Sequence, residues 1–184
     1  KCTSLVLLRL PDKVTTISAN AFGSCSNLES VSIGKDLMPP KDADVQWFSD
    51  APVKNLSVSS SLLMTENYTK ETSFLKRYFP KNLLESLIIL DLVTLGSYAF
   101  YGAKSLSSVS LPESLTSIGE GTFDSCSNLR SIIIPDKVIS IGDRAFYSCA
   151  SLNEVVFGAS LSLETLGEDF LGGPTGARAP VATV

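Results

Sequence analysis

The sequence predicts a repeat solenoid, mainly β, of about seven stacked coils with a parallel sheet along one face. Phenylalanines recur at an interval of 23 residues, and a fixed period in the twenties is typical of solenoids. Each period also contains a short segment with apolar residues at every second position, which is the spacing of a strand. A single coil cannot bury its own apolar face, whereas stacked coils form a continuous core. The phenylalanines that define the interval are Phe100, Phe123 and Phe146.

The alternating segment is expected to form the first strand of each coil, with its apolar side chains pointing inward. Pro11, Pro112 and Pro135 stand where these segments end, and proline ends a strand because it has no N–H to donate. In chain order the inward pairs are Leu8/Leu10, Val31/Ile33, Leu56/Val58, Leu87/Ile89, Val109/Leu111, Ile132/Ile134 and Val155/Phe157.

A second apolar group follows each strand and is expected to return along the other side of the coil. The phenylalanine then closes the coil and fills the space between the two sides. The second groups are Val14/Ile17, Leu115/Ile118, Val138/Ile141 and Leu163/Leu166, and the closing pairs are Ala21-Phe22, Ala99-Phe100, Thr122-Phe123 and Ala145-Phe146.

The middle of the chain interrupts the pattern near residues 35–82. Residues 35–50 contain Pro39-Pro40 and the only tryptophan. Residues 62–82 are polar and free of proline until Pro80, so we expect that they can form a short helix. We expect residues 1–171 to form the solenoid and residues 172–184, rich in small residues and proline, to be a flexible tail or linker. Because the chain opens inside a repeat, we expect it to be a fragment or a processed form.

Composition excludes several classes of function. The net charge is −4 with a pI near 4.8, whereas a nucleic-acid-binding face would be basic. The most apolar run, residues 83–95, contains two carboxylates and is too short to span a membrane. Histidine is absent, which removes the commonest general base. There is no nucleophile or phosphate-loop motif, so we expect neither an enzyme nor a bound cofactor.

The unit C-x-x-L-x-x-V-x-I-P-x-x-V-x-x-I-G-x-x-A-F resembles the BspA-like branch of the leucine-rich repeats, best matched by residues 102–146. The asparagine that usually follows the strand in leucine-rich repeats is replaced by proline or glycine. The resemblance implies a right-handed leucine-rich-repeat stack and a protein that is secreted or exposed on the cell surface. It also implies adhesion, including to extracellular-matrix proteins such as fibronectin and fibrinogen.

Four cysteines occupy the same repeat position in two pairs, each pair 23 residues apart. The preferred interpretation is a ladder of small buried thiols, which suits free cysteine. A disulfide within each pair is the first alternative, since neighbouring coils hold the Cα atoms at bridging distance, although parallel side chains disfavour it. A four-cysteine zinc site is the second alternative. The pairs are Cys2/Cys25 and Cys126/Cys149.

Two other features carry possible chemistry. Carboxylates recur at Glu120, Asp143 and Glu168, where they are either a solvated edge or a calcium-binding column. Glycosylation sequons stand at Asn55 and Asn67, of which Asn67 is the better candidate because the residue after Asn55 is a core position.

The outward residue of each strand gives the candidate ligand face. Serine is expected at such solvated positions, whereas Ile133 and Val156 lie side by side and are apolar, which marks either a partner site or simply good strand formers. We expect a protein or glycan ligand on this face. A spacer within a longer array and a self-assembling array are the alternatives, the latter through end-to-end association. The face comprises Arg9, Ser32, Ser57, Ile88, Ser110, Ile133 and Val156.

Overall fold

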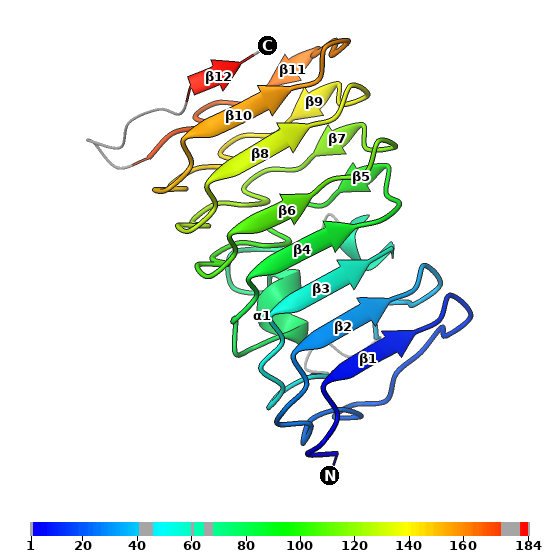
Figure 1. Cartoon of the computed structure of the whole chain (residues 1–184). Helices are drawn as coiled ribbons and strands as arrows, with labels where there is room; N and C mark the ends of the chain where they lie inside the picture. The colour runs from blue at the N-terminus through cyan, green and yellow to red at the C-terminus, as the bar shows by residue number, and fades with distance from the viewer. Residues whose placement is uncertain (1, 41–45, 60, 65–67, 174–180, 184) are drawn as a thin grey trace.

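The chain folds into a parallel β solenoid of about seven turns with almost no helix, as the repeat predicted (Figure 1). The computed structural model describes residues 2–40, 46–59, 61–64, 68–173 and 181–183. Successive coils stack along one axis, so that each coil contacts its neighbours in sequence. The core therefore runs the length of the stack.

The first strands of the coils form the front of the solenoid. Neighbouring strands are parallel and keep the same register across the insertions, so that Leu8 pairs with Val31 and Leu56 with Leu87. Because side chains alternate along a strand, this register keeps the apolar set on the core side of every coil. The front strands are β1 (Leu7–Leu10), β2 (Ser30–Ile33), β3 (Asn55–Val58), β4 (Ser86–Ile89), β6 (Ser108–Ser110), β8 (Ser131–Ile134) and β10 (Glu154–Phe157).

A second, narrower sheet forms the rear of the C-terminal half. It is one continuous four-stranded ladder in which Leu95 pairs with Ile118 and Ile118 with Ile141. A Cβ added at Gly119 would lie 2.6 Å from the backbone nitrogen of Ser97 in the preceding coil, so glycine lets the backbones approach here. The rear strands are β5 (Thr94–Leu95), β7 (Ser117–Ile118), β9 (Ser140–Ile141) and β11 (Thr165–Leu166).

Stacked phenylalanine rings fill the space between the two sides of the coils. In the regular coils the Phe100 and Phe123 ring centroids are 5.6 Å apart, and Phe123 stacks on Phe146 at 5.4 Å. Offset stacking of this kind stabilises the pair beyond the area it buries. The column predicted from the 23-residue interval is therefore present in the structure.

The two irregular coils keep the column with phenylalanines that the repeat did not mark. Phe48 lies between Phe22 at 5.4 Å and Phe79 at 4.9 Å, with nearly parallel planes. Phe74 then connects Phe79 to Phe100, at centroid distances of 5.8 and 5.7 Å. The insertions therefore lengthen the loops without interrupting the aromatic core.

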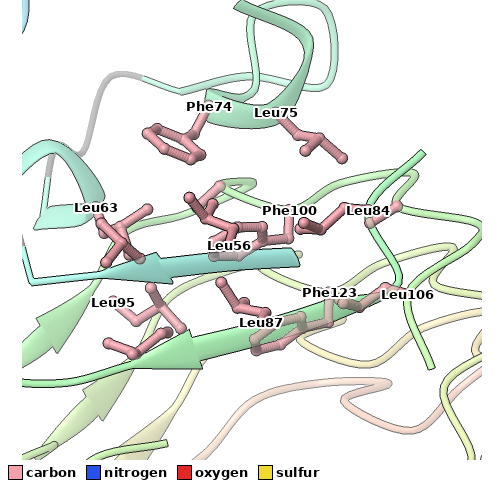
Figure 2. Close-up of a cluster of buried hydrophobic side chains, with 14 of the residues drawn as sticks. Leu56, Leu63, Phe74, Leu75, Leu84, Leu87, Leu95, Phe100, Leu106 and Phe123 are labelled. Carbon is pink, nitrogen blue, oxygen red and sulfur yellow. The ribbon is translucent and has the colours of Figure 1, made fainter. Parts of the chain in front are cut away.

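The second insertion contains the predicted helix, α1 (Phe74–Tyr78), which follows a 3₁₀ turn, η1 (Ser61–Met64). The hydroxyl of Ser73 caps α1 by accepting a hydrogen bond from the Lys76 amide at 3.2 Å. Figure 2 shows Phe74 and Leu75 of α1 lying over the core leucines of the neighbouring strands. Helix α1 therefore packs on the solenoid rather than projecting from it.

Residues 172–184, which we expected to be a tail or linker, include a short strand, β12 (Val181–Thr183). It pairs in parallel with β10, with Val155 opposite Ala182 (Figure 1). No repeat pattern marks these residues. The free edge of a parallel sheet offers backbone N–H and C=O groups to any adjacent extended segment, which explains how a segment without the repeat joins the sheet.

Candidate ligand-binding face

The predicted outward residues of the first five front strands form one row across the sheet. Arg9 of β1 is aligned with Ser32, Ser32 with Ser57, and Ser57 with Ile88. The row continues to Ser110 of β6. All five residues lie on the solvent side because they alternate with core residues along each strand.

A second outward row lies two residues earlier on the same strands, and the sequence analysis missed it. Only one outward position per strand was considered there, although a four-residue strand presents two. Side chains alternate along a strand with a period of two residues, and this alternation would have indicated the second outward position. This second row comprises Leu7, Ser30, Asn55, Ser86 and Ser108.

The two rows enclose a groove over β1–β4, with a cavity volume of about 240 Å³. The groove is hollow because its floor consists of serines, whose side chains are short. Longer side chains close it at either end, Leu7 and Arg9 on β1 and Ile88 on β4. The structure therefore brings four of the seven predicted face residues together in one concave site: Arg9, Ser32, Ser57 and Ile88.

Most polar groups of the groove have unused hydrogen-bonding capacity. The Asn55 side chain donates to the Ser30 hydroxyl at 3.2 Å. Within the described part of the chain, the hydroxyls of Ser32 and Ser57 have no hydrogen-bond partner, and Arg9 has no ion pair. These groups are therefore free to bind a ligand.

The front sheet is interrupted between β6 and β8. Strands β1 to β6 form one sheet and β8, β10 and β12 form another, whereas the rear ladder continues past the same point. The inward side chains of Val109 and Leu111 are only half-buried here, although Ile132 and Ile134 in the next coil are buried. We call this break in the front sheet, at which two inward side chains are partly exposed, the front seam (Figure 1).

The front seam separates the groove from the predicted apolar pair. Ile133 and Val156 are directly opposite each other on β8 and β10, as their spacing indicated. Ile133 is 65% exposed, whereas Val156 is half-buried. Strand β12 lies alongside β10 at this point. The expected pair of exposed residues is therefore one exposed isoleucine beside a partly covered valine.

The cysteine ladder is present with one difference from the expectation. Cys25, Cys126 and Cys149 are buried, whereas Cys2 is exposed, and all four are free thiols. The Cys149 thiol donates to the carbonyl oxygen of Phe123 at 3.1 Å. Burial raises the pKa of the Cys126 thiol well above its usual value, and the adjacent Cys149 thiol adds to this effect. These interactions favour the inert, protonated thiol.

The carboxylate column makes contacts within the solenoid. Glu120 accepts a hydrogen bond from the Tyr98 hydroxyl, and Asp143 accepts one from the Glu168 amide at 2.8 Å. Among the described residues, no group of three cysteine or carboxylate side chains is arranged to hold a metal ion. Of the two sequons, Asn55 lies in the groove wall, and Asn67 lies outside the described residues.

The fold and its face define a class of protein, a leucine-rich-repeat solenoid with an exposed strand face. The sequence pattern described as the BspA type leucine rich repeat region matches residues 1–87 and 72–172, in six copies. The chain belongs to this family, as the resemblance predicted. Among curated proteins, none matches the chain significantly.

Three solved structures are similar to the chain. A leucine-rich repeat protein from Bacteroides ovatus has 21% identity and a TM-score of 0.49, over 92% of this chain and 59% of the other. The pneumococcal vaccine antigen PcpA has 19% identity and a TM-score of 0.45, over 88% and 54%. A leucine rich cell surface protein from Faecalibacterium prausnitzii has 16% identity and a TM-score of 0.43, over 96% and 62%. The chain therefore spans less than two thirds of each of these proteins.

Leucine-rich repeats generally mediate protein interactions, and the family is generally non-enzymatic. Within the described ranges, no helix has both the length and the apolar character needed to cross a bilayer.

Proposed function

We propose that the chain is a non-enzymatic binding module at the cell surface or in the secreted fraction. It binds a protein or glycan ligand through its front strand face, in adhesion or host interaction. Extracellular-matrix proteins are the first ligands to test, because the family resemblance implies them.

The groove over β1–β4 is the observation that supports this proposal. A solvated sheet face of short polar side chains would ordinarily be flat, whereas here the longer Arg9 and Ile88 enclose a hollow floored by Ser32 and Ser57. Concave sites with a few convergent polar groups are the usual places where ligands bind. The solenoid holds these groups rigidly, since the strands that carry them form one continuous sheet.

The test is a binding panel of immobilised fibronectin, fibrinogen and a glycan array, probed with the chain and with three variants. Ser57→Tyr fills the groove and leaves the core side of β3 unchanged, because Ser57 points outward. The Ile133→Asp/Val156→Asp double variant tests the face beyond the front seam. Ile139→Tyr is the matched control, since Ile139 is exposed beside the rear strand β9.

We expect Ser57→Tyr to abolish a specific interaction that Ile139→Tyr retains, with equal circular dichroism spectra for both. Loss of binding only in the double variant would place the site beyond the front seam but still on the strand face. Equal binding by all variants would exclude the strand face. No binding by the unmodified chain to any probe would favour a spacer within a longer array.

A further inference from the structure

We propose that the groove over β1–β4 binds a single acidic sugar unit, with its anionic group on Arg9 and its hydroxyl groups on the serines of the floor. This inference rests on the proposed function, because it names the ligand class for the same face. It commits to a saccharide, whereas the proposed function allows a protein or a glycan.

Charge is the first step of the argument. Among the described residues, Arg9 is the only charged side chain that lines the groove, and it has no ion pair there. The nearest paired charges, Lys54 and Glu29, form a salt bridge with each other at 3.3 Å. A guanidinium group presents parallel N–H donors that match a carboxylate or a sulfate. The Arg9 guanidinium is therefore available to bind an anionic group of a ligand.

The hydroxyl groups are the second step. Ser32, Ser57 and Ser86 line the groove, and none of their hydroxyls has a hydrogen-bond partner within the described residues. Each hydroxyl both donates and accepts, so the floor matches a ligand that carries several hydroxyl groups of its own. A sugar ring is such a ligand.

The backbone disfavours a peptide strand as the ligand. Strands β2 to β4 are paired on both sides within one hydrogen-bonded sheet, and only the outer edge of β1 is open, so the floor of the groove offers no strand edge. Recognition of an extended peptide commonly relies on such an edge. The ligand must therefore be recognised through the side chains, which again favours a compact polyol.

Size and lining complete the argument. The volume of about 240 Å³ lies just below the range of roughly 300–1,000 Å³ for drug-sized ligands, so the groove holds one ring rather than a long segment. Within the described ranges no aromatic residue lines it, and a neutral sugar therefore lacks the stacking platform on which it would rely. Leu7, beside Arg9 on β1, offers an apolar contact to the ring edge, and the charge on Arg9 supplies the selectivity.

The test measures binding of N-acetylneuraminic acid and glucuronic acid, with N-acetylglucosamine and glucose as neutral counterparts, by titration calorimetry and saturation-transfer NMR. The variants are Arg9→Met and Arg9→Lys. Lys13→Met is the matched control, because Lys13 is an exposed cation in the turn after β1, outside the groove.

We expect at least one acidic sugar to bind and its neutral counterpart to bind at least about tenfold more weakly, as loss of a charge-assisted pair predicts. Arg9→Met should lower the affinity to the neutral level, Arg9→Lys should restore part of it, and Lys13→Met should change nothing. Added salt should weaken binding by the unmodified chain, since the groove is open to solvent.

Three results would overturn the inference: equal affinity for acidic and neutral sugars, no effect of Arg9→Met, or binding of a glutamate-rich peptide as tight as that of the acidic sugars. If a matrix protein binds in a Ser57-dependent way while no sugar does, the proposed function stands and this inference fails. If neither class of probe binds, both fail.

Discussion

The ammonium group of Lys70 lies 3.5 Å from the carboxylate of Asp124, and the Asp124 side chain is only 3% exposed. The two residues come from the second insertion and from a regular coil of the C-terminal half. Lys70 also lies over the rings of Tyr98 and Tyr101, at 5.9 and 5.4 Å from their centroids. This ion pair therefore connects the second insertion to a regular coil of the C-terminal half.

Lys70→Met is expected to lower the free energy of unfolding by about 1–2 kcal/mol, because it leaves a buried carboxylate without its cation. The Ser125 hydroxyl, which donates to Asp124 at 2.7 Å, limits the loss. Urea unfolding measures this change, and limited proteolysis should show faster cleavage within residues 62–82. Lys104→Met, at an exposed position, is the control. Equal stability of the two variants would mean that the ion pair does not fasten the loop.

Phe48→Ala is expected to cost about 3–5 kcal/mol of stability, the usual range for a fully buried phenylalanine. Phe48 is 0% exposed and stacks on both Phe22 and Phe79. Phe123→Ala in a regular coil is the comparison, and thermal or urea unfolding of both variants is the measurement. A much smaller loss at Phe48 would show that the irregular coils are appended to the core rather than part of it.

The sequence was sufficient to predict the coils, because their residues repeat at one interval and the register follows from it. Phe100, Phe123 and Phe146 marked the aromatic column in advance. Phe48 and Phe79 could not be marked in this way, since insertions place them off the interval. Trp47 also lies in an insertion that the repeat does not mark, yet it is 0% exposed and stacks on Tyr78 at 4.2 Å.

The candidate site was only partly predictable. Alternation placed Arg9, Ser32 and Ser57 on the solvent side, but whether they form a groove depends on the relative size of the side chains in both outward rows. The front seam had no signal in the repeat, because Val109 and Leu111 match the pattern as well as their counterparts in paired strands do. Spacing along the chain reports register and does not report whether two aligned strands approach closely enough to bond.

Backbone amides of β6 and β8 that face the front seam are expected to exchange hydrogen at least about tenfold faster than those of β4, because amides without a strand partner lack protection. Strand β4 is the control, since it pairs with β3 on one side and β6 on the other. Hydrogen–deuterium exchange followed by mass spectrometry should resolve residues 106–111 and 130–134 from residues 86–89. Uniform protection across the three segments would mean that β6 and β8 are paired in solution.

Tyr98 is expected to titrate far above the usual range for tyrosine. Burial raises its pKa to about 12, with the hydrogen bond to Glu120 and the negative charges of Glu120 and Asp124 adding to the effect. Because the pKa in the folded state exceeds that in the unfolded state, the stabilisation is complete below about pH 10 and declines as the pH rises through 12. The difference in phenolate absorbance between the unmodified chain and Tyr98→Phe measures the pKa, and Glu120→Gln should lower it. No change in Glu120→Gln would leave burial and the charge of Asp124 as the causes.

Gly102→Ala and Ser148→Gly are expected to change stability in opposite directions. Gly102 and Ser148 occupy the same place in their coils, just after the stacked phenylalanine, and both have left-handed backbones with φ of 72° and 55°. A Cβ at position 102 would meet no atom within 4 Å, so the alanine variant reports the backbone term without a clash. A residue with a Cβ is less stable than glycine in this conformation by about 1 kcal/mol. Gly102→Ala should therefore lower the free energy of unfolding, and Ser148→Gly should raise it. Urea midpoints of both variants measure it, and a shift of the same sign in both would mean that side-chain contacts, rather than backbone conformation, select the residues at these turns.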